Sequence, residues 1–73
     1  MPYDYSKLSG RIVEKYETQA KFACAMGLSE RSISLKLNGK VGWKQSEILQ
    51  ACKLLDIPVS QIPAYFFSVK VQD

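Results

Sequence analysis

The feature that most constrains the fold is a pair of short helical segments with a break of only about three residues between them. Thr18 can cap the first segment, QAKFACAM, and Gly27 suits the left-handed residue that ends it. Ser29 can cap the second segment, ERSISLKLN, which Asn38 and Gly39 close. Helices this short are marginal alone, so both must pack against other parts of the chain.

The residues at this junction follow a specific spacing. Counting from Gln19, Ala23 stands fifth, Gly27 ninth, Leu28 tenth and Ile33 fifteenth. A small residue lets two helices cross closely, glycine permits the tight turn, and the two apolar residues pin the second helix. An ordinary pair of helices without a ligand is the alternative, but the four matches favour a helix-turn-helix.

Three further helical segments surround this pair. Asp4 can cap the first, Pro58 ends the fourth, KQSEILQACKLLD, and Ser60 can cap the fifth, QIPAYFF, whose first turn tolerates Pro63. We therefore expect an all-α fold of five short helices around one core. The apolar residues at helical spacing are Leu8, Ile12, Val13 and Tyr16 in the first segment and Ile48, Ala51, Cys52 and Leu55 in the fourth.

The length of 73 residues corresponds to a single domain, residues 1–73, with its core over about residues 5–66. In the tail, residues 67–73, apolar and polar residues alternate as in a strand, but the segment is too short to form a sheet alone. Val69 and Val71 would allow it to pair with a second copy and form a homodimer; disorder of the tail is the alternative.

Charge is unevenly distributed along the chain. Residues 1–44 contain eight lysines and arginines against four acidic residues, a net charge of +4, whereas residues 45–73 contain two against three, a net of −1. A negatively charged partner would therefore prefer the N-terminal two-thirds. No apolar run approaches the roughly 18 residues of a membrane span, and no secretory signal is visible, so we expect a cytoplasmic protein without a membrane partner.

Enzymatic or metal chemistry has little support in the sequence. The chain contains no histidine and only two cysteines, Cys24 and Cys52, which are too far apart for a metal motif. Both cysteines fall in apolar helical stretches, and we expect buried thiols. The carboxylates show no pairing pattern and no glycine-rich phosphate loop is present. We therefore expect no catalytic residue, no metal and no cofactor.

The stretch TQAKFACAMGLSERSISLKLNGK resembles the helix-turn-helix of the Cro and phage-repressor family, the XRE type. The similarity continues through EILQACKLLDIPVSQIPAYF and so covers about residues 5–66. YSKLSGRIVEKY and GLSERSISLKLNGKV resemble small Cro-like regulators and modulators of repression from temperate phages of Gram-positive bacteria. The resemblance implies a regulator of the lysis–lysogeny switch that binds operator DNA. The alternative is an antirepressor that binds the DNA-binding domain of the phage's main repressor.

The resemblance also implies roles for single residues. Gln19 would donate to a phosphate, Ser29 would approach phosphate together with the N-terminus of its helix, and Arg31 would read guanine. Lys36, Lys40 and Lys44 would steer the DNA backbone. The full set of DNA-contacting residues implied in this way is Gln19, Ser29, Arg31, Ser32, Ser34, Leu35, Asn38 and Lys40.

Several residues of the second segment leave alternatives open. Glu30 would repel phosphate, and a helix-stabilising role is favoured over cytosine recognition. Leu35 would contact a thymine methyl, belong to a protein-binding patch or lie in the core. Asn38 would cap its helix or pair with adenine. Lys36 stands where the family usually has an apolar residue, so Leu37 is expected to replace it in the core while the Lys36 ammonium reaches water. The possible face for a protein partner is Glu30, Arg31, Ser34, Leu35 and Asn38.

The aromatic residues of the C-terminal half also have two interpretations. Trp43 covers the edge of the core or stacks on a partner surface. Tyr65, Phe66 and Phe67 close the open end of the core or form a binding site, and closure is favoured.

Overall fold

The computed structural model describes residues 3–69, which form five α-helices and one short 3₁₀-helix. No strand is formed within this range, where an isolated antiparallel bridge between Tyr3 and Val69 is present. The expected all-α fold is therefore confirmed. In chain order the elements are α1 Ser6–Tyr16, α2 Gln19–Met26, α3 Glu30–Leu37, α4 Gln45–Leu55, η1 Val59–Gln61 and α5 Ile62–Phe66.

The local signals around α2 and α3 act as the sequence predicts. The Thr18 hydroxyl accepts the backbone N–H of Lys21, and the Ser29 hydroxyl accepts that of Ser32. Gly27 has a φ of 74°, the left-handed conformation that lets the chain leave α2 and enter α3 at once. These caps satisfy N–H groups that a helix terminus leaves without a partner in the helix.

Three residues lie elsewhere than the sequence predicted. Val13 is 57% exposed, because it lies about 100° around α1 from the buried Ile12. Cys24 is exposed because it lies about 100° around α2 from the buried Ala23, whereas Cys52 is buried as expected. Ser60 does not cap α5, since the segment begins one turn earlier as the 3₁₀-helix η1.

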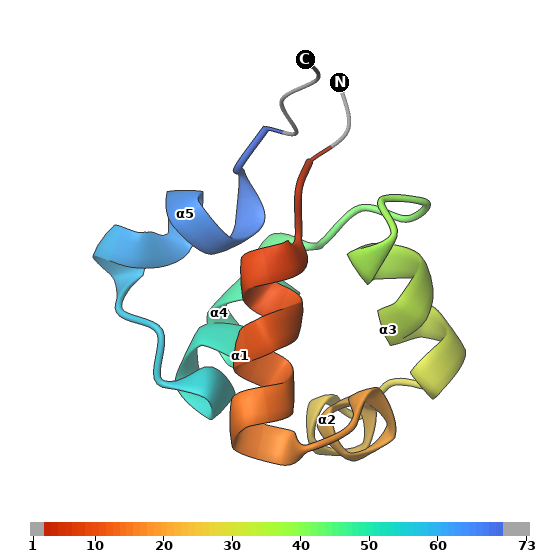
Figure 1. Cartoon of the computed structure of the whole chain (residues 1–73). Coiled ribbons are helices and arrows are strands. Elements are labelled where there is room, and N and C mark those ends of the chain that lie inside the picture. Colours follow the sequence, from red (N-terminus) through yellow and green to blue (C-terminus); the bar gives the residue numbers. More distant parts are fainter. Residues whose placement is uncertain (1–2, 70–73) are drawn as a thin grey trace.

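The core lies where the helices meet. In Figure 1, α1 crosses the front of the molecule with α4 behind it, α2 lies beneath them and α3 stands to one side. α3 packs mainly on α2 and α1, and the exposed Arg31 and Asn38 lie on its solvent-facing side. The largest fully buried side chains are Phe22, Phe66, Leu8, Ile12, Ile33 and Leu55.

The two ends of the described chain lie side by side. Besides the bridge between Tyr3 and Val69, the Asp4 N–H donates to the Ser68 carbonyl over 2.6 Å. This pairing holds the N-terminal segment beside the end of α5 (Figure 1). Val71, which we expected to take part in dimerisation, lies outside the described residues. None of the helices within residues 3–69 has the length and apolar character needed to cross a bilayer.

Candidate helix-turn-helix interface

The geometry of α3 separates an inner from an outer face. Ile33 and Lys36 are buried on the inner face. At about 100° per residue, Arg31, Leu35 and Asn38 lie on the opposite face. Arg31 and Asn38 are exposed, and Leu35 is half-buried.

The structure brings most of the residues implied as contacts together on α3 and its flanks. Gln19 starts α2, Ser29 immediately precedes α3, and Lys40 follows it in the loop to α4. Glu30, in the first turn of α3, is exposed and forms no ion pair within residues 3–69. The exposed members of the set are Ser29, Glu30, Arg31, Asn38 and Lys40, and the half-buried members are Gln19, Ser32, Ser34 and Leu35.

Leu35 is an apolar side chain without a place in the core. The half-buried apolar residues that pack against the core include Leu28 and Leu37 but not Leu35. Leu37 therefore packs against the core as expected, and the position of Leu35 argues against the core alternative for that residue. An apolar side chain at the centre of an otherwise polar face is suited to contact with a partner.

Several polar groups of α3 are engaged within the helix itself. The Asn38 side-chain amide donates to the Ser34 carbonyl over 2.8 Å and thus binds the C-terminal turn, which supports the capping alternative. The Ser29 hydroxyl bonds both the N–H and the hydroxyl of Ser32. Arg31 forms no hydrogen bond or ion pair among the described residues, so its guanidinium is available to a partner.

Lys36 is held in a buried ion pair, which sequence reasoning missed. Its side chain is only 6% exposed, and its ammonium lies 2.9 Å from a Glu47 carboxylate oxygen and 3.0 Å from the Gly42 carbonyl. The expectation that this ammonium reaches water was therefore wrong, and burial makes Lys36 unavailable for steering DNA. The sequence feature that could have indicated this pair is Glu47, an acidic residue in the first turn of α4, but its partner lies in another helix.

Glu47 also stabilises the start of α4 by accepting the Lys44 N–H over 2.8 Å. Burial by itself would raise the pKa of Glu47. The hydrogen bonds from Lys36 and the Lys44 backbone, with the positive charges of both lysines, outweigh burial and hold that pKa below its ordinary value. The carboxylate is therefore ionised at neutral pH and neutralises the one cation on the inner face of α3.

Ion pairs reduce the positive charge that the N-terminal two-thirds offers to a partner. Four of its eight cations are paired within the described residues, and Lys7 lies over the ring of Tyr65. Three cations, Arg31, Lys40 and Lys44, remain on and beside α3, and Glu30 lies among them. The four pairs are Arg11–Glu14, Lys15–Asp56, Lys21–Glu17 and Lys36–Glu47.

Trp43 and Phe66 close the core beside the loop that follows α3. Their rings meet edge to face with centroids 5.3 Å apart, and Phe66 is buried, which agrees with closure of the core by Phe66 and with a Trp43 that covers its edge. Phe67, by contrast, is 48% exposed and does not close the core. No group of three or more potential metal ligands occurs in the part of the chain that the structure describes.

The short α2–α3 junction at Gly27, the outward face of α3 and the supporting helices define a helix-turn-helix domain. The chain belongs to the family described as "Protein of unknown function (DUF739)", whose model matches residues 1–69. No curated relative was found.

A solved structure extends this assignment. The chain is 58% identical to the modulator of repression (MOR) of the temperate bacteriophage TP901-1 from Lactococcus lactis, with a TM-score of 0.81 to its solution structure. The match covers 99% of this chain and 97% of that protein. The chain is thus a homologue of a phage regulator and not of an enzyme, which agrees with the expected lack of catalysis.

Proposed function

We propose that this protein modulates repression by binding the DNA-binding domain of a phage repressor through the outer face of α3. The contact residues in this proposal are Glu30, Arg31, Ser34, Leu35 and Asn38. Binding at this place would compete with, or alter, the repressor's contact with its operator. The similarity to a modulator of repression supports this function over direct operator binding.

The observation that carries the proposal is the composition of the outer face. Leu35 is apolar and stands outside the core, and Glu30 is an exposed, unpaired carboxylate in the first turn of the same helix. A DNA-binding domain has a positively charged surface, to which a carboxylate is attracted. An apolar side chain flanked by polar groups is typical of the centre and rim of a protein interface.

Co-purification with the N-terminal domain of the repressor from the same phage tests the proposal. Wild-type protein should form a stable complex, and Leu35→Ala should weaken it at least about fivefold, because truncating a central apolar contact costs more than about 1 kcal/mol. Val13→Ala is the matched control, since Val13 is an exposed apolar helix residue outside the α3 face. Failure of the wild-type protein to bind the repressor domain would contradict the proposal.

Operator DNA is the second candidate partner, and the three unpaired cations Arg31, Lys40 and Lys44 favour it. The contacts would be those implied by the family resemblance, namely Gln19, Ser29, Arg31, Ser32, Ser34, Leu35, Asn38 and Lys40. Replacing Arg31 should then cost about 1–3 kcal/mol at one base position, whereas replacing Lys40 should weaken binding to all sequences alike. Gel shifts at low salt that show no preference for the phage control region over random DNA would rule this candidate out.

One substitution separates the two candidates because it acts on them in opposite directions. Glu30→Lys removes a charge that repels phosphate and adds one that attracts it, so it should strengthen DNA binding. The same change places a cation against the basic surface of a repressor domain and should weaken that complex. Gln50→Lys, at an exposed position of α4, controls for a general increase in positive charge.

A further inference from the structure

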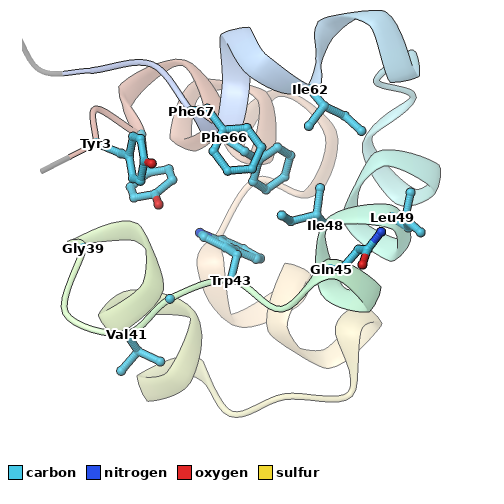
Figure 2. A pocket seen from close by; sticks show the side chains of 12 residues that line it. Tyr3, Gly39, Val41, Trp43, Gln45, Ile48, Leu49, Ile62, Phe66 and Phe67 are labelled. Atoms are coloured by element: carbon cyan, nitrogen blue, oxygen red, sulfur yellow. The ribbon is translucent and has the colours of Figure 1, made fainter. Parts of the chain in front are cut away.

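A second candidate interface is an apolar groove beyond the C-terminal end of α3. It has a volume of about 730 Å³ and lies between the N-terminal segment, the α3–α4 loop, α4 and α5. Figure 2 shows Trp43 at its centre, with Phe66 and Ile48 to one side and Tyr3 to the other. Its lining is aromatic and aliphatic apart from glycines and the Gln45 amide, and includes no charged side chain.

The edges of the groove expose large apolar side chains. Tyr3, Val41, Leu49 and Phe67 are each between 43% and 48% exposed. These four come from different parts of the chain and surround one opening. An apolar surface gathered in this way indicates a binding site, because single exposed apolar residues are ordinary but clusters are not. Because these edge side chains are exposed, the groove is open to solvent and accessible to a segment of another protein.

The charges beside the groove select the kind of partner. Lys40 and Lys44 flank the stretch Val41–Trp43, and neither forms an ion pair within residues 3–69. Glu47, on the adjoining turn, is already bound by Lys36. Asp4 lies between the lining residues Tyr3 and Tyr5 but does not itself line the groove, and its carboxylate accepts the Ser6 N–H. The loop side of the groove is therefore positively charged and complements an acidic partner.

We propose that this groove binds an amphipathic helix of a partner protein. Apolar side chains at helical spacing would lie against Trp43 and the exposed edge residues Val41 and Leu49, and acidic residues along one flank would lie beside Lys40 and Lys44. This is recognition of a helix in a groove, in which a few apolar anchors supply affinity and flanking charges supply orientation. The groove does not include the outer face of α3, so the protein would have two separate binding surfaces.

The test uses Trp43, the only tryptophan of the chain, as its reporter. The probes are three peptides of about 15 residues, a length at which a helix can form on a surface. One has leucines at helical spacing with glutamates between them, the second has lysines in place of the glutamates, and the third is a scrambled version of the first. None contains tryptophan. The leucine–glutamate peptide should change Trp43 emission saturably, and the other two should bind at least about tenfold more weakly.

Variants locate the binding to the groove. Val41→Glu should weaken binding of the leucine–glutamate peptide by at least about tenfold, since it puts a carboxylate at the apolar edge of the groove. Val59→Glu is the matched control, because Val59 is 72% exposed and does not line the groove. Lys40→Glu combined with Lys44→Gln should reverse the preference in favour of the leucine–lysine peptide. Leu35→Ala should leave peptide binding unchanged, which separates this proposal from the function of the α3 face.

Several results would overturn the proposal. Absence of a saturable change with the leucine–glutamate peptide would do so, as would equal binding of all three peptides. Equal weakening by Val41→Glu and Val59→Glu would place the binding elsewhere. A concentration-dependent change in Trp43 emission without peptide, with a dimer in sedimentation, would show that a second copy occupies the groove instead.

Discussion

Lys36→Leu and Glu47→Gln, made separately and together, test how α3 is fixed to the rest of the domain. The two side chains are 6% and 14% exposed, so either substitution alone leaves an almost buried charge without its counter-ion. Breaking a buried pair in this way costs about 3–5 kcal/mol, and we expect about 3 here because Glu47 keeps the Lys44 N–H as a partner. A small domain has a stability of the order of 5 kcal/mol, so either single variant should lose much of it.

The double variant should recover most of this loss. Lys36→Leu supplies the apolar residue that the Cro and phage-repressor family usually has at this position. The amide introduced by Glu47→Gln can still accept the Lys44 N–H and can donate to the Gly42 carbonyl that the ammonium leaves. Replacing a buried pair by neutral groups is often close to neutral, and we expect a net loss within about 1–1.5 kcal/mol.

Urea unfolding followed by far-ultraviolet circular dichroism measures the three variants against the wild type. This signal reports all helices, whereas Trp43 emission would be disturbed directly, because the Lys36 ammonium lies 5.8 Å from the Trp43 ring. The sum of the stability losses in the two single variants should exceed the loss in the double variant by more than about 3 kcal/mol. If the losses simply add, or if each single variant loses less than about 1 kcal/mol, the pair does not hold α3 as we infer.

Two further predictions concern acid and glycine. Because the pKa of Glu47 is lower in the folded than in the unfolded protein, its stabilising contribution is complete above the ordinary glutamate value of about 4.3 and is lost as the pH falls through the folded value. Urea midpoints measured from pH 7 to pH 3 should therefore fall more for the wild type than for the Lys36→Leu, Glu47→Gln variant; equal slopes would contradict the assignment. Gly27→Ala should destabilise by about 1–2 kcal/mol, since φ is 74° there, although no atom lies within 4 Å of the added methyl group. Gly10→Ala, equally free of contacts but within α1, should stabilise by up to about 1 kcal/mol in thermal unfolding, and the same sign for both substitutions would refute the conformational argument.

The parts of the fold that the sequence predicted correctly depend on signals a few residues long. The caps at Thr18 and Ser29 and the left-handed turn at Gly27 involve only neighbours within three or four positions. The Lys36–Glu47 pair could not be predicted in this way, because it joins two helices across a loop whose path is set by packing. The groove was missed for a similar reason, since its walls combine the chain's N-terminal segment with α4 and α5.

The same distinction explains why the sequence located the interface but left its partner open. The helical period alone puts Arg31 and Leu35 opposite Ile33, so the outer face of α3 follows from spacing. The net charge of α3 depends instead on contacts with distant residues, as in the pair that neutralises Lys36 with Glu47 of α4.

Burial of Lys36 decides much of the balance between DNA and protein as partners of α3. An ammonium on the outer face would have added a phosphate contact, and each such contact contributes to DNA affinity through release of a counterion. With that charge bound by Glu47, the helix itself presents Arg31 against Glu30, and positive charge remains mainly at Lys40 and Lys44, which also flank the groove. A face that is nearly neutral and centred on Leu35 gains little binding free energy from phosphate groups. Its desolvation cost is also small when another protein covers it. The ion pair on the inner side of α3 thus favours a protein partner on its outer side.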